Sequence, residues 1–186
     1  MRFDVITLFP ELFGPHLTLG VTRRAYESAQ LDVKLWPLRD FADNAYRRVD
    51  DRPYGGGPGM VMLAEPLERA LQAVRVARSE ADPAPLVLFS PTGRRIDQAL
   101  VREWATGAGA VLLCGRYEGV DQRFIDRHGA LELSLGDFVL SGGELPWTSH
   151  ITDTGQRLRC RWIKAYFTAT LSRSTPWPFL RCRAPS

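Results

Sequence analysis

The feature of this sequence that most limits its fold is a set of short, almost wholly apolar runs. Residues 86–89 (LVLF) and 110–114 (AVLLC) contain no alternating polar positions, and further apolar-rich runs occupy residues 3–8, 31–36 and 131–135. A strand with one face in water alternates apolar and polar residues, whereas a strand covered on both faces is apolar throughout. We therefore expect an α/β fold in which a parallel sheet is flanked by helices.

Helical patterns lie between these runs. In residues 66–78 one apolar stripe is expected to face the sheet; it consists of Leu67, Ala70, Leu71 and Val74. Asp97 and Asp121 are suited to cap two further helices, which would run to residues 104 and 128. The alternation of strands and helices is typical of an α/β domain.

The connection formed by residues 39–59 is unusually long, charged and rich in glycine. Connections of this kind inside a compact domain are usually functional or mobile. The alternative is a disordered surface loop, and composition alone does not separate the two.

Charge is distributed unevenly along the 186 residues, whose formal net charge is +3. Residues 1–146 contain 17 basic and 20 acidic side chains, whereas residues 147–186 contain seven basic side chains and one acid. The basic excess therefore belongs to the last forty residues. The three cysteines lack metal-ligand spacing, and the first residues lack a signal-peptide core. We expect a soluble, cytoplasmic protein with no metal and no membrane segment.

Glycine-containing loops follow three of the expected strands, at residues 90–93, 114–119 and 135–144. Ligands of open α/β sheets bind beyond the carboxyl ends of the strands, where glycine lets the backbone approach a flat ligand closely. No phosphate-binding glycine motif is present. One such loop alone would indicate only a tight turn, but three after consecutive strands predict a ligand pocket.

Four motifs carry a family resemblance: TLFPELF (7–13), VDDRPYGGGPGM (49–60), LCGRYEGV (113–120) and GDFVLSGGELP (136–146). Over residues 1–146 the chain resembles the bacterial tRNA (guanine-N1) methyltransferase family, of the knotted SPOUT class. The resemblance implies a C-terminal trefoil knot and a homodimer. It also implies methyl transfer from S-adenosylmethionine to guanosine at tRNA position 37.

The resemblance also implies which residues form the sites. The cofactor-binding residues would be Ser90, Pro91, Gly115, Tyr117, Glu118, Leu135, Gly136, Asp137, Phe138, Val139, Leu140, Gly142 and Gly143. Residues 50–59 would shape the target-base side, with Asp50 and Arg52 binding substrate. Guanine N1 carries a proton at neutral pH, so the reaction needs a general base. In the family this base is an aspartate beyond the knot, which no residue here matches, so the catalytic residue is left unassigned.

After Pro146 the resemblance ends, and residues 147–186 form an atypical basic tail in place of the family's C-terminal tRNA-binding domain. Its Arg, Cys, Trp, Ser and Pro content favours an out-of-frame translation product, the alternative being a divergent tail that binds RNA. Two functions follow. One is the family's methyltransferase activity, and the other is that of a truncated, catalytically inactive cofactor-binding fragment or dimerisation module.

Overall fold

Five parallel strands form the central sheet of this computed structural model, which describes residues 1–20, 23–78 and 84–146. The spatial order of the strands is β2-β1-β6-β5-β7. Their bounds are Arg2–Thr7 for β1, Asp32–Pro37 for β2, Leu86–Arg95 for β5, Gly109–Leu113 for β6 and Leu131–Ser134 for β7. Each expected apolar run corresponds to one of these strands, and the predicted parallel sheet is confirmed. The expectations for residues 147–186 lie outside the described residues.

Both faces of β1, β6 and residues 86–89 of β5 are buried, as the unbroken apolar runs predict. Along β1 and β5, Phe3 and Val87 belong to one hydrophobic cluster, whereas Ile6 and Leu88 belong to a second cluster on the opposite face. Successive side chains of a strand point to opposite faces, so a strand between two helical layers is apolar at nearly every position; on β1 the buried exceptions are Asp4 and Thr7.

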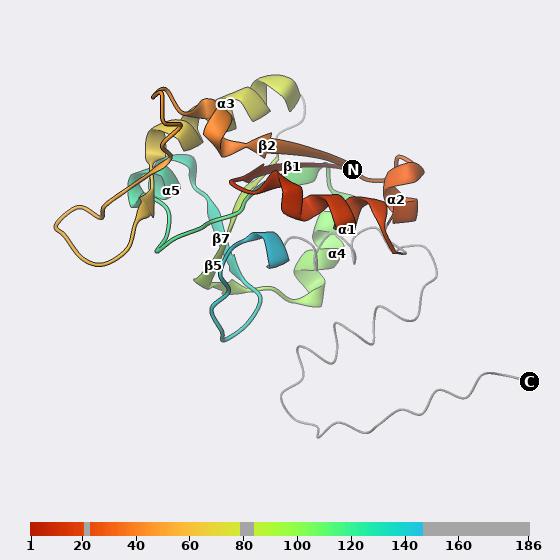
Figure 1. The fold of residues 1–186 in the computed structure, drawn as a ribbon. Helices are drawn as coiled ribbons and strands as arrows, with labels where there is room; N and C mark the ends of the chain where they lie inside the picture. The colour runs from red at the N-terminus through yellow and green to blue at the C-terminus, as the bar shows by residue number, and fades with distance from the viewer. Residues whose placement is uncertain (21–22, 79–83, 147–186) are drawn as a thin grey trace, which may run out of the picture. The chain divides into compact units, whose positions relative to one another are not determined.

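Helices cover each face (Figure 1). The helix α4 (Gln98–Thr106) contributes Leu100, Val101 and Trp104 to the first cluster. The second cluster includes Leu67, Ala70, Leu71 and Val74 of α3 (Ala64–Arg78), together with Phe124 and Ile125 of α5 (Gln122–His128). The apolar stripe expected on the first of these helices is therefore confirmed. Among the described residues, no helix is long and apolar enough to cross a bilayer.

The two expected N-caps are present. The Asp97 carboxylate accepts a hydrogen bond from the Leu100 amide at 2.8 Å, and the Asp121 carboxylate accepts one from the Arg123 amide at 2.9 Å. Each bond satisfies an amide that the first turn of the helix leaves without a backbone partner.

Several short elements escaped sequence analysis because each is only a few residues long. They are η1 (Pro10–Phe13), α1 (Gly14–Thr18), α2 (Arg23–Glu27), η2 (Leu38–Phe41), β3 (Asp50–Asp51) and β4 (Val61–Met62). The strands β3 and β4 pair in antiparallel fashion and close the second half of the long charged connection into a hairpin. The glycine-rich part of that connection is thus held between two paired strands.

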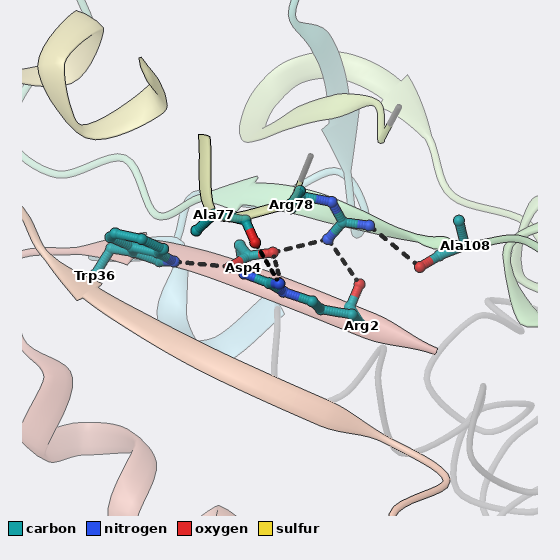
Figure 2. A network of polar contacts seen from close by, with 6 residues as sticks. All are labelled: Arg2, Asp4, Trp36, Ala77, Arg78 and Ala108. Carbon is teal, nitrogen blue, oxygen red and sulfur yellow. Dashed lines mark hydrogen bonds and ion pairs between the residues drawn. The ribbon is translucent and has the colours of Figure 1, made fainter. Parts of the chain in front are cut away.

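A buried polar network ties the start of β1 to the end of α3 (Figure 2). The carboxylate of Asp4 has no solvent exposure and accepts hydrogen bonds from Arg2 at 3.0 and 2.9 Å, Trp36 at 2.8 Å and Arg78 at 2.7 Å. Burial raises the pKa of Asp4, but the hydrogen bonds from Arg2, Trp36 and Arg78 outweigh it and hold the pKa below its ordinary value. Arg78 also donates to the carbonyls of Arg2 and Ala108, so both buried charges are fully engaged.

Candidate functional site

A cavity of about 380 Å³ opens at the carboxyl ends of β5, β6 and β7. Leu88, Ile125 and Leu133 give it apolar walls, and the three glycine-containing loops supply most of the rest of its lining. Its volume falls within the range of about 300–1,000 Å³ that is typical of small-molecule sites. The expectation that the strand-end loops converge on one pocket is confirmed.

The loop after residue 89 forms through a break in the ladder between β5 and β7. Pairing is lost after Phe89 and resumes at Arg94, so β5 extends to Arg95, beyond the run of residues 86–89. A side chain at Gly93 would overlap the backbone of Glu132, its Cβ lying 2.5 Å from that residue's carbonyl carbon. Glycine at position 93 therefore lets β5 lie close against β7 where the ladder is interrupted, and residues 90–92 line the cavity.

The structure brings eleven of the thirteen expected cofactor-binding residues to this cavity. Those eleven are Ser90, Pro91, Gly115, Tyr117, Glu118, Leu135, Phe138, Val139, Leu140, Gly142 and Gly143. Gly136 and Asp137 do not line it. Gly136 instead exchanges hydrogen bonds with the Ser134 hydroxyl at 2.9 and 3.2 Å, which shapes the turn that follows β7.

Two of the loops are in direct backbone contact at the wall of the cavity. The amide of Gly143 donates to the carbonyl of Gly115 at 3.0 Å. A Cβ at Gly143 would lie 2.6 Å from Cys114 Cα and 3.0 Å from the Gly115 nitrogen. Because these neighbours are backbone atoms that cannot turn aside, this close approach requires glycine.

A buried carboxylate beside the cavity joins the same loops through their side chains. Glu144 is 4% exposed and pairs with the guanidinium of Arg116 at 3.0 Å, and it accepts a hydrogen bond from the Thr7 hydroxyl at 3.0 Å. Arg116 also donates to the Ser141 carbonyl at 3.1 Å and lies over the Phe9 ring at 4.6 Å. One carboxylate thus connects the ends of β1 and β6 with the loop that follows β7.

A second cavity, of about 620 Å³, lies beside the β3–β4 hairpin. Arg52 lines it together with Tyr54, which is fully exposed, whereas Asp50 does not line it and pairs with Met62 in the hairpin. Sequence analysis assigned Asp50 and Arg52 to one substrate-binding region, and only Arg52 borders this hollow.

The hairpin is joined to the loop after β6 by three backbone hydrogen bonds. The amide of Glu118 donates to Met60 at 3.0 Å, that of Met62 to Gly119 at 2.9 Å, and that of Asp121 to Met62 at 3.0 Å. The walls of the two cavities are therefore mechanically connected.

Four polar residues that follow β6 in the sequence, namely Arg116, Tyr117, Glu118 and Asp121, belong to different parts of the site. Arg116 forms the buried ion pair, Tyr117 and Glu118 border the first cavity, and Asp121 borders the second. The side-chain hydrogen bond from Arg123 is the main cause of the lowered pKa of Asp121. Tyr117 has a φ of 60°, a left-handed backbone conformation that non-glycine residues adopt mainly at constrained sites.

Neither a cysteine nucleophile nor a metal centre is evident in the described part of the chain. Burial, with the nearby Glu144 charge, raises the pKa of the Cys114 thiol well above its usual value, which disfavours the reactive thiolate. Residues 1–20, 23–78 and 84–146 contain no group of three or more His, Cys, Asp or Glu side chains that could hold a metal ion.

Sequence analysis did not identify Thr7 or Glu144 as site residues, although both lie inside motifs that carry the resemblance. Their partnership joins positions 137 residues apart. The available signal for Glu144 was its place directly after two glycines in the loop that follows β7, and this pattern does not distinguish a buried acid from a surface acid.

The model of the family described as "tRNA (Guanine-1)-methyltransferase TrmD" matches residues 1–159. A tRNA (guanine-N(1)-)-methyltransferase of Leptothrix cholodnii is 72% identical over 146 residues, covering 78% of this chain and 58% of that protein. The similarly named proteins of Methylibium petroleiphilum and Xanthomonas oryzae are 71% and 56% identical over 148 and 145 residues, again covering 78% of this chain and 58% and 55% of those proteins.

The alignments with these relatives are close in length to the 1–146 region of motif resemblance, and the family model reaches beyond it. The chain spans 58% of the length of the first of these relatives. Since the family model covers most of the 186 residues, including the three strand-end loops and the hairpin, the chain belongs to the tRNA (guanine-1)-methyltransferase TrmD family.

Proposed function

We propose that the strand-end cavity binds S-adenosylmethionine and that the chain takes part in methylation of guanine N1 in tRNA, at position 37. The observation that carries this proposal is the convergence of eleven expected cofactor-binding residues on one cavity in a member of this family. Curated relatives bearing the name tRNA (guanine-N(1)-)-methyltransferase support the reaction class.

The donor set of the cavity fits this cofactor. Leu88, Ile125 and Leu133 offer apolar surface to a flat base, while the backbone around Gly115 can approach the polar edge of that base closely. Glu118 and Ser90 offer a carboxylate and a hydroxyl to the polar remainder of the molecule. The absence of side chains at Gly142 and Gly143 leaves room for the loops to pack on one another behind the ligand.

The cofactor, when bound, supplies an activated methyl group on its sulfonium centre. The residues of the chain then have to bind the cofactor, orient it toward the acceptor and keep water away, so that binding and alignment reduce the barrier. Methylation also requires removal of the N1 proton of guanine. Among the described residues, we assign none as the general base for this proton transfer.

The second cavity is our candidate for the target-base side. Arg52 can contact phosphate, and the exposed ring of Tyr54 can stack on an unpaired base, which is how single-stranded RNA is commonly held. The three hydrogen bonds between the hairpin and the loop after β6 would keep the acceptor side in register with the cofactor side.

The proposal includes the finer family properties as well. We propose a C-terminal trefoil knot, an S-adenosylmethionine-binding domain over residues 1–146 followed by a distinct tail, a homodimer and a cytoplasmic location among the tRNA pool. Phe138 and Val139, which are adjacent exposed apolar residues in the cavity lining, support the dimer, because exposed apolar patches are typical of interfaces.

Two measurements test the proposal with the purified 186-residue chain. Calorimetric titration with S-adenosylmethionine should give saturable binding, and saturable binding that the variant Gly143→Ala weakens would place the ligand in the strand-end cavity. Transfer of tritiated methyl groups to unmodified tRNA above a no-enzyme control is the expected activity. Binding without transfer would favour the inactive cofactor-binding module, and absence of both would refute the proposal.

A further inference from the structure

We propose that Glu144 and Thr7 are positioning residues, which hold two of the three loops of the strand-end cavity, those after β6 and β7, in ligand-binding geometry without contacting the ligand. The identity of the ligand rests on the function proposed above. The loop geometry itself does not depend on that identity.

Neither residue reaches the cavity. Thr7 has no solvent exposure, Glu144 is 4% exposed, and neither belongs to the cavity lining. Any effect of these side chains on ligand binding must therefore pass through the residues that they touch.

The contacts of Glu144 run to both cavity loops. Its carboxylate pairs with Arg116 through Nη2 at 3.0 Å and accepts from Nε at 3.3 Å, and Arg116 lines the cavity. Arg116 in turn donates to the carbonyl of Ser141, which lines the opposite loop. The guanidinium thus forms a cross-link between the loop after β6 and the loop after β7, and Glu144 holds that cross-link in place.

Thr7 fixes the carboxylate against the rigid sheet. Its hydroxyl donates to Glu144 Oε1 at 3.0 Å and accepts from the Phe9 amide at 3.0 Å. Phe9 also covers the guanidinium of Arg116, so water has little access to the ion pair. Hydrogen bonds to buried charged groups are among the stronger interactions in proteins, and the loss of one partner leaves the other without compensation.

In a surface salt bridge the loss of one charged partner has little effect, because solvent takes its place. Here the Arg116 side chain is 20% exposed and that of Glu144 is 5% exposed. Neutralising the Glu144 carboxylate therefore frees the Arg116 side chain, and the two loops lose the cross-link that supports the hydrogen bond between Gly143 and Gly115.

The test compares Glu144→Gln and Thr7→Val with Thr7→Ser, which keeps the hydroxyl. The matched control is Asp4→Asn, since Asp4 is an equally buried ion-paired carboxylate that lies outside the cavity lining. Amide hydrogen exchange of residues 115–119 and 136–143 is measured by mass spectrometry, below the unfolding midpoint of every variant. Titration with S-adenosylmethionine gives the dissociation constant.

We expect Glu144→Gln and Thr7→Val to accelerate exchange in both loops and to weaken binding by about tenfold or more. Thr7→Ser should remain near the wild-type values. Asp4→Asn should lower the unfolding temperature while leaving loop exchange and affinity unchanged, which separates positioning from general destabilisation.

The inference is overturned if Glu144→Gln and Thr7→Val lose thermal stability but match Asp4→Asn in loop exchange and in affinity. If the wild-type chain binds no S-adenosylmethionine, the proposed cofactor is wrong. Loop exchange alone then decides whether these two residues position the cavity.

Discussion

Replacing Asp4 by asparagine should destabilise the fold strongly, because it leaves Arg78 charged and buried. The Arg78 side chain is 2% exposed, whereas that of Arg2 is 24% exposed and can turn toward water. Removing one partner of a buried ion pair costs about 3–5 kcal/mol. At about 2–4 °C per kcal/mol for a domain of this size, the unfolding midpoint should fall by about 6–20 °C.

Differential scanning calorimetry and urea titration measure this effect. A double variant, Asp4→Asn with Arg78→Met, removes the stranded charge as well. The decrease in its free energy of unfolding should therefore be smaller than the sum of the decreases in the two single variants. A loss below about 1 kcal/mol in Asp4→Asn, or strict additivity of the two variants, would refute the argument that the buried Arg78 charge sets the cost.

The same pair should make stability depend on pH in acid. The pKa of Asp4 is lower in the folded state than its ordinary value, so its contribution is complete above the unfolded-state pKa of about 4. That contribution is lost as the pH falls through the lowered folded pKa. The stability difference between the wild type and Asp4→Asn should therefore shrink in acid, and a difference that grows there would contradict this assignment.

Three further outcomes follow from the structure. Gly143→Ala should lower the free energy of unfolding by about 1–3 kcal/mol and weaken S-adenosylmethionine binding, because the added methyl group meets backbone atoms 2.6 and 3.0 Å away. The control for the calorimetry is Gly107→Ala, where the nearest neighbour of an added methyl group is 3.5 Å away. Cys114 should resist alkylation until the chain unfolds, since its pKa is raised by burial, and peptide mapping would detect early modification that contradicts this. Asp97→Ala should slightly lower the unfolding temperature at neutral pH, because it removes the cap of α4. The hydrogen bond from the Leu100 amide lowers the pKa of Asp97, so the stability difference between the wild type and Asp97→Ala should vanish as the pH falls through this lowered pKa.

Local pattern was sufficient to predict the five strands of the central sheet, the helices α3, α4 and α5, and the site loops. Unbroken apolar runs such as residues 86–89 indicated strands covered on both faces, and Asp97 and Asp121 marked where two helices begin. These signals lie within a few residues of the structure that they produce. The cavity was also predictable, because parallel strands end at the same edge of a sheet and three glycine-containing loops follow three of them.

The family resemblance supplied what pattern alone did not, namely the proposed cofactor and the class of reaction. It assigned thirteen residues to one site, and the structure gathers eleven of them. It placed Asp50 and Arg52 in the same site, whereas only Arg52 borders the second cavity. The side on which a hairpin residue lies depends on how β3 and β4 pair.

Tertiary structure alone decided which charged residues are buried and with what partners. In the sequence, Asp4 and Glu144 look no different from the acids of the surface, yet one carboxylate meets Arg78 and the other meets Thr7 and Arg116. Those partners lie 74, 137 and 28 residues away along the chain. Apolar periodicity records only whether a position faces a core, whereas a buried ion pair depends on which distant segments the strand order β2-β1-β6-β5-β7 places side by side.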